Sequence, residues 1–173
     1  MAEIWPVHFF FQKPINMSPF FKRILWTGLI AGFLDILSAY IHVFVNTHQI
    51  SRKMFNYIAA GAIGLKNSMS GGAAAIALGV FIHFFIAFLF TLFFFLIYRK
   101  ARLFTVNKYV MALVYGLFTW FVMNVIVLPL SQLPHRPFNA GSQAVEAGIL
   151  VVTIGLPLSL SARAFFSRTR VMA

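Results

Sequence analysis

The stretch ILWTGLIAGFLDILSAYIHVFVN, residues 24–46, decides what kind of protein this is. It is long enough to cross the hydrocarbon core of a bilayer, which needs about 20 apolar residues. One ionisable carboxylate, Asp35, stands in the middle of this run. A carboxylate at mid-membrane depth costs about 2.5–3.5 kcal/mol on insertion scales, so Asp35 is the first candidate for a functional residue.

Three further segments, residues 73–98, 109–130 and 147–166, are also long and apolar enough to span. A fifth apolar stretch, at 54–65, is too short to cross. We expect it to form an interfacial or re-entrant helix on the outer side of the bundle. The predicted fold is therefore all-α: a polytopic membrane protein built as a four-transmembrane-helix bundle.

The same pattern divides the chain into three parts. Residues 1–23 are expected to form an N-terminal cytoplasmic or interfacial segment, which lacks the basic start and short apolar core of a cleavable signal. Residues 24–166 form a single four-helix transmembrane domain, whose first span acts as a signal anchor. Residues 167–173 form a basic cytoplasmic tail.

Composition agrees with a membrane protein and excludes several classes of function. Of the 173 residues, 61% are hydrophobic and 10% are charged, whereas soluble domains are about half apolar and about a quarter charged. The absence of cysteine excludes disulfides, thiolate nucleophiles and cysteine-ligated metal sites. The net charge of +11 comes from basic clusters beside the apolar segments, which predicts contact with anionic lipid and not with nucleic acid.

Basic residues also predict the orientation. One side of a four-span bundle carries Lys13, Lys22, Arg23, Arg99, Lys100, Arg102, Lys108, Arg163, Arg168 and Arg170. The other side carries Arg52, Lys53, Lys66 and Arg136. Because cytoplasmic loops of membrane proteins are enriched in Lys and Arg, both termini are predicted to be cytoplasmic.

Small residues and one histidine predict how the spans meet. Small residues at four-residue spacing occur on three spans, as Gly28 and Gly32, as Ala75, Gly79 and Ala87, and as Ala112 and Gly116. Such stripes let helices approach closely in lipid. His83 lies on the same stripe of the second span. Because the first two spans are antiparallel, His83 and Asp35 are expected at about the same depth in the membrane. We therefore predict a hydrogen bond or ion pair between Asp35 and His83, with a neutral pair as the alternative.

Further polar residues are expected to lie between this pair and the outer side of the membrane. Ser38 and His42 continue the face of Asp35, and Asn124 lies in the outer half of the third span. Residues expected at the outer mouth are Asn46, His48, His135, Arg136 and Glu146. The cytoplasmic half is mostly Phe, Leu and Ile. The predicted site is thus a polar pocket of Asp35, His83, His42 and Asn124, open to the outside and closed on the inside.

Three functional interpretations remain open. The first is a pocket that binds or conducts a proton, a small ion or a small ligand, because intramembrane ionisable residues often mark such pathways. The second is a non-catalytic accessory or structural subunit of a larger membrane complex, in which the Asp35–His83 pair only fixes helix register. The third is a haem- or metal-binding protein that uses His42 and His83, since imidazoles on two helices can ligate such groups. Besides lipid, a homo-oligomer or a larger complex is the expected partner.

Enzymatic catalysis is not expected. No serine stands in a nucleophile-elbow context, and no HExxH motif is present. A pair of intramembrane aspartates is also missing, because the chain has only three acidic residues, Glu3, Asp35 and Glu146. The sequence therefore predicts neither a catalytic residue nor a metal site nor a bound cofactor.

Several motifs resemble a group of small four-span bacterial inner-membrane proteins of unknown function, and more distantly the YagU-like membrane proteins. They are Gly–x–x–Asp at 32–35, Leu–Gly–x–x–x–His at 78–83, Met–Asn at 123–124 and Leu–Pro–Leu–Ser at 128–131. The resemblance covers most of residues 24–162 and implies a four-helix fold in the inner membrane. It marks Asp35, His83, Asn124, Pro129 and Ser131 as signature positions. Another His before the Gly–Leu–Pro of the fourth span is typical of the group; this chain has Leu150 and Val151 there, so a site completed by that His would be incomplete.

Overall fold

The structure, a computed structural model, describes residues 17–49, 53–101, 103, 106–134 and 139–171. Across these ranges the regular elements are all helical. In chain order they are α1 (Met17–Thr47), α2 (Met54–Ile63), α3 (Leu65–Ser70), α4 (Gly72–Lys100), α5 (Lys108–Phe121), η2 (Val122–Val127), α6 (Leu128–Leu130), α7 (Ala140–Leu150), η3 (Val151–Gly155) and α8 (Leu156–Val171), where η marks a π-helical segment. The prediction of an all-α fold is confirmed.

Four stretches of helix are long and apolar enough to cross a membrane: Pro19–Thr47, Gly72–Lys100, Lys108–Leu130 and Ala140–Ser167. They confirm the four predicted spans, with longer ends. The first helix already begins at Met17, and the fourth already begins at Ala140. It begins early because the Asn139 side chain accepts a hydrogen bond from the Ser142 N–H at 3.0 Å and so caps α7.

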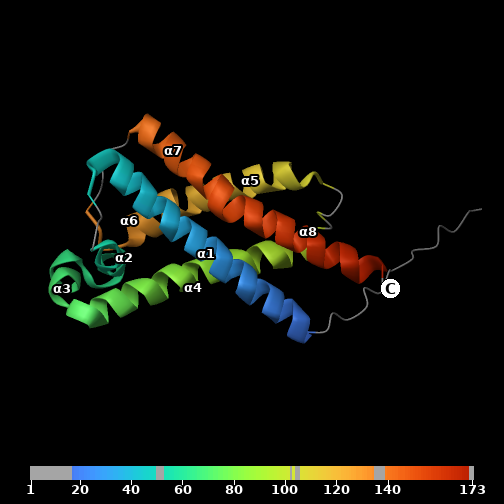
Figure 1. The fold of residues 1–173 in the computed structure, drawn as a ribbon, viewed down its shortest axis with the longest axis horizontal. Helices are drawn as coiled ribbons and strands as arrows, with labels where there is room; N and C mark the ends of the chain where they lie inside the picture. The colour runs from blue at the N-terminus through green and yellow to red at the C-terminus, as the bar shows by residue number, and fades with distance from the viewer. Residues whose placement is uncertain (1–16, 50–52, 102, 104–105, 135–138, 172–173) are drawn as a thin grey trace, which may run out of the picture.

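The four spans alternate in direction (Figure 1). The start of α1 and the end of α8 lie toward one end of the bundle, which we call the terminal end. The short helices α2 and α3 lie at the opposite end together with α6, and we call this the α2 end. Residues 1–16, Arg52, Arg102, His135, Arg136 and the last two residues, to which some expectations refer, lie outside the described residues.

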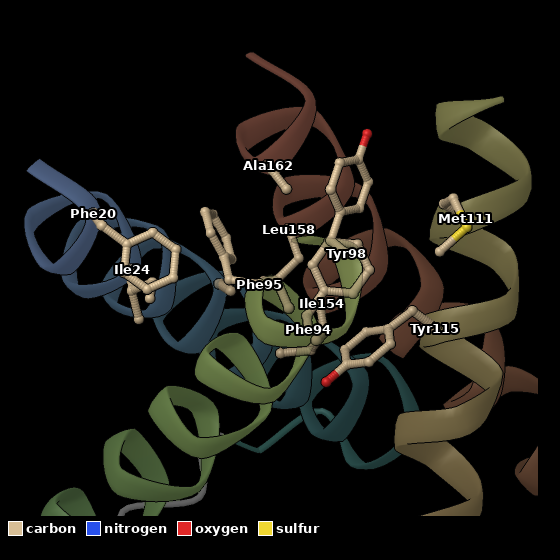
Figure 2. Close-up of a cluster of buried hydrophobic side chains, with 11 residues drawn as sticks. Phe20, Ile24, Phe94, Phe95, Tyr98, Met111, Tyr115, Ile154, Leu158 and Ala162 are labelled. Carbon is tan, nitrogen blue, oxygen red and sulfur yellow. The ribbon is translucent and has the colours of Figure 1, made fainter. Parts of the chain in front are cut away.

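The terminal end is filled by an aromatic core (Figure 2). Phe94 and Tyr115 meet edge to face with their ring centroids 4.5 Å apart, a geometry that adds about 0.5–1.5 kcal/mol to area burial. The Tyr115 hydroxyl donates to the Phe90 carbonyl at 2.6 Å. Phe95 and Tyr98 are also almost fully buried. We call Phe94, Phe95, Tyr98 and Tyr115 the aromatic plug, because together they close this end of the bundle.

Small residues bring the helices close together. A Cβ on Gly79 would overlap the backbone carbonyl of Phe55, and a Cβ on Gly116 would overlap the backbone of Val151. A Cβ on Gly32 would come within 3.0 Å of the Phe84 ring. The stripe on α4 therefore serves two neighbours, since its Gly79 end faces α2 and its other end faces α1. Only backbones without side chains between them can approach in this way.

Two π-helical segments interrupt the third and fourth spans, and each precedes a proline. The segment η2 ends just before Pro129, and η3 ends just before Pro157. Proline lacks an N–H, and its ring presses on the carbonyl four residues earlier, so the preceding turn cannot keep regular α-helical bonds. A wide π turn accommodates this, and such turns are frequent at functional sites.

The α2 end is built by α2 and α3, which form a corner. Gly64 turns the chain between them with a positive φ of 78°, which glycine adopts without penalty. The buried Asn56 amide donates to the Ser68 carbonyl at 2.8 Å, and the Ser68 hydroxyl donates back to the Asn56 carbonyl. The predicted short helix is thus present as α2, whereas α3 was not predicted.

Candidate intramembrane site

A cavity of about 700 Å³ lies inside the bundle between the aromatic plug and the α2 end. It is lined mainly from α1, α2, α4, η2 and α7, with single residues from α3, α5, α6 and η3. Asp35, His42, His83 and Asn124, the four residues singled out in the sequence, all line it. Three separate spans contribute these side chains, so the fold brings together residues that are up to 89 positions apart.

Asp35 is partly buried on α1 and faces the fourth span. Its Oδ1 atom accepts a hydrogen bond from the Thr153 hydroxyl at 3.3 Å. Thr153 belongs to η3, and the same hydroxyl lies 2.9 Å from the Ile149 carbonyl oxygen, one turn earlier. Because a hydroxyl carries one proton, Thr153 can satisfy only one of these acceptors at a time. The carboxylate is therefore held by a single shared donor.

His83 lies beside Asp35 but bonds to a different atom of α1. Its Nε2 atom is 2.8 Å from the carbonyl oxygen of Gly32. A carbonyl can only accept, so Nε2 carries the proton in this arrangement. Both side chains line the same cavity. Among the described residues no direct hydrogen bond or ion pair joins them, so the direct bond expected from the sequence is not formed.

His42 and Asn124 bond within their own helices. The Asn124 amide donates to the Trp120 carbonyl at 3.1 Å. Asn46 donates to the backbone carbonyl of His42 at 2.7 Å. Both side chains line the cavity without a hydrogen bond to Asp35 or His83 in the described part of the chain. The positions of His42 and Asn124 fit the predicted polar lining. Asn124 does not hold Asp35 or His83 in place by a hydrogen bond.

Two charged residues from other elements border the same cavity. Lys53, next to α2, is exposed, and Glu146 on α7 is partly buried. Glu146 was expected near the outer mouth and does lie in the wall. Asn46 and His48, expected in the same cluster, are exposed and are not part of the lining. The cavity therefore contains both acidic residues that the structure describes.

Thr153 is the main site residue that sequence reasoning missed. A threonine in a span usually satisfies its own hydroxyl with the carbonyl four residues earlier, so it does not stand out. The available signal was its position four residues before Pro157, where the helix is forced to widen. Asn124 precedes Pro129 by five residues in the same manner. Both π-helical segments thus carry a polar side chain of the site: Asn124 lines the cavity, and Thr153 bonds to Asp35, which lines it.

The chemistry within reach of Asp35 is limited to proton exchange, hydrogen bonding and charge attraction. Asp35 and His83 line the same cavity, and the Thr153 hydroxyl is bonded to the carboxylate. In the described ranges, three or more His, Asp or Glu side chains nowhere gather in a group suited to a metal ion.

Four apolar spans identify the chain as a multi-pass α-helical membrane protein. Compared with known proteins, the chain matches no family model, no curated protein and no solved structure.

Proposed function

We propose that this protein is a non-enzymatic membrane protein whose central cavity binds or conducts a proton, a small ion or a small ligand at Asp35. The observation that carries the proposal is the placement of the carboxylate. Asp35 stands in the wall of a cavity inside an apolar bundle, with one shared hydroxyl donor and a histidine at its side. A charge placed there is expensive in a membrane unless it is paired or used.

The neighbouring residues have distinct proposed roles. Asp35 accepts the proton or cation. Thr153 supplies a hydroxyl that can donate to the carboxylate or accept from the carboxylic acid. His83 stands beside it in the cavity wall, and its bond to Gly32 keeps the ring in place. His42 and Asn124 provide a polar wall between Asp35 and the α2 end.

The proposed access is from one side. The aromatic plug blocks the terminal end, whereas the exposed Lys53 borders the cavity at the α2 end. The excess of basic residues near the terminal end supports a cytoplasmic location for both termini. With the resemblance to small bacterial membrane proteins, this supports an inner-membrane protein whose cavity opens toward the periplasm.

Asp35→Asn tests the proposal, because it removes the charge while keeping the shape of the side chain. Wild type and variant would be reconstituted in liposomes loaded with a pH-sensitive dye, and proton and monovalent-cation flux would be followed under an imposed potential. Ligand binding would be followed as a shift of the melting temperature with added cations. We expect Asp35→Asn to abolish whichever response the wild type gives.

Lys66→Gln is the matched control, because Lys66 is exposed on α3 and lines neither of the two cavities described in this structure. It changes the net charge by one unit, in the opposite direction, without touching the site. A folded Asp35→Asn protein with wild-type flux and wild-type thermal shifts would contradict the proposal.

A further inference from the structure

A second cavity, of about 880 Å³, adjoins the first. Tyr57, Ile86, Met123, Asn124 and Glu146 stand in the walls of both cavities. Together they offer far more room than a proton or a bare ion needs. Cavities of about 300–1,000 Å³ are typical sites for organic ligands.

The second cavity is apolar. Ile82 and the apolar residues 125–130 form part of its wall. Of its polar groups, the Trp120 ring nitrogen is already bonded to the Gln143 side chain at 3.1 Å. Val125 and Ile126 are exposed on the outside of the bundle, where lipid would surround them. This space therefore suits a hydrophobic group, which can reach it from the bilayer.

The first cavity is also mostly apolar, but it adds the carboxylate of Asp35 to that of Glu146, which borders both cavities. The chain carries a net charge of +11 and has three acidic residues. Glu3 lies outside the described residues, and the other two, Asp35 and Glu146, both line this cavity. Among the described residues that line it, Lys53 is the one Lys or Arg. A cleft with low-dielectric walls focuses such a field and attracts positive charge.

We propose that the two adjoining cavities together bind a hydrophobic organic cation. The positive centre lies near Asp35 and Glu146, and the apolar groups occupy the second cavity. Tyr57, Phe90 and Trp120 supply aromatic rings in the walls, and such rings attract organic cations over their faces. This inference rests on the proposed function and names the ligand class of the same site.

The test is equilibrium binding of radiolabelled tetraphenylphosphonium to the full-length protein in lipid nanodiscs, with empty nanodiscs as the blank. Tetraphenylborate has nearly the same shape and the opposite charge, so its own binding, measured in a separate sample because the two ions pair with each other, separates charge recognition from apolar partitioning. Tetramethylammonium carries the charge without the apolar groups. We expect saturable binding of the phosphonium, weak competition by tetramethylammonium and no saturable binding of radiolabelled tetraphenylborate.

Four variants locate the site. Asp35→Asn and Glu146→Gln each remove one negative charge and should weaken phosphonium binding, Asp35→Asn by about tenfold or more. Ile82→Phe fills the second cavity without changing charge, so it should weaken phosphonium binding and leave proton or small-cation flux intact. Lys66→Gln should bind as the wild type does.

Two results would overturn the inference: saturable binding of tetraphenylborate with the affinity of the phosphonium, or unchanged phosphonium affinity in both Asp35→Asn and Ile82→Phe. The charge comparison on the wild type and the Ile82→Phe variant remain decisive even if Asp35→Asn fails to fold. If the phosphonium does not bind saturably while Asp35→Asn still abolishes flux, this inference fails and the proposed function stands. If Asp35→Asn folds and changes neither flux nor phosphonium binding, both this inference and the proposed function fail.

Discussion

The Nε2 atom of His83 lies 2.8 Å from the carbonyl oxygen of Gly32, one helical turn before Asp35 on the neighbouring helix. This contact joins α1 to α4 at the depth of the cavity. It exists because Gly32 has no side chain, which lets the Phe84 and Ala87 side chains of α4 pack against the α1 backbone. The glycine and the histidine therefore act as a pair that sets the position of Asp35.

His83→Phe should destabilise the bundle by about 0.5–2 kcal/mol, because it keeps a ring but removes the interhelical hydrogen bond. His83→Gln can still donate to the Gly32 carbonyl and should lose less. The measurement is equilibrium unfolding of the purified protein in mixed micelles with increasing sodium dodecyl sulfate. Equal stability of wild type and His83→Phe would show that this hydrogen bond does not hold α1 against α4.

Replacing glycine by alanine should change the stability by very different amounts, depending on what surrounds each glycine. Gly79→Ala and Gly116→Ala place a methyl group into the backbone of Phe55 and of Val151, and overpacking of this kind costs about 1–3 kcal/mol. Gly148 lies on helix α7 with no other atom within 4 Å of a Cβ built there. Gly148→Ala should therefore be neutral, or stabilising by about 0.5–1 kcal/mol through helix propensity.

The same unfolding measurement checks the glycine series, with Gly148→Ala as the internal control. Because α2 packs directly against Gly79, the Gly79→Ala variant should displace α2. This displacement should expose the cavity at the α2 end and increase proteolysis there. Similar stabilities for all three variants would mean that the close helix contacts are not tight enough to discriminate against a methyl group.

The spans and the two central side chains could be predicted because the bilayer imposes strong constraints. An apolar run of fixed length has few alternatives, and an ionisable residue within it, such as Asp35 or His83, is rare enough to stand out. Small residues indicated which faces meet. These signals are local in sequence and need no knowledge of the packing.

The features that were missed depend on packing or on short-range geometry. Helix α3 has only six residues, which is too short for a periodic pattern to predict it. The hydrogen bonds between Asn56 and Ser68 hold it in place. Proline at 129 or 157 signals a distorted helix without saying that the turn will widen into a π segment. Whether Thr153 bonds only its own helix or also reaches Asp35 depends on how η3 packs against α1.

Thr153→Val should impair the site without unfolding the protein. Valine keeps the β-branched shape but removes the hydroxyl that Asp35 and the Ile149 carbonyl share. The carboxylate then loses its donor, so the Asp35-dependent flux or binding should fall several-fold, and stability should fall by about 0.5–1.5 kcal/mol. Thr153→Ser retains the hydroxyl and should restore most of the activity. Equal activity of the valine and serine variants would exclude Thr153 from the site.

Orientation in the membrane can be tested with single thiols, because the chain contains no cysteine. Ser70→Cys places a thiol on the exposed face of α3 at the α2 end, and Ser167→Cys places one on the exposed side of α8 at the terminal end. With cytoplasmic termini, a membrane-impermeant maleimide should label Ser70→Cys in intact bacterial spheroplasts and Ser167→Cys only after lysis. The reverse labelling pattern would mean that the cavity opens toward the cytoplasm. Labelling of both thiols before lysis would contradict placing the α2 end and the terminal end on opposite sides of the membrane.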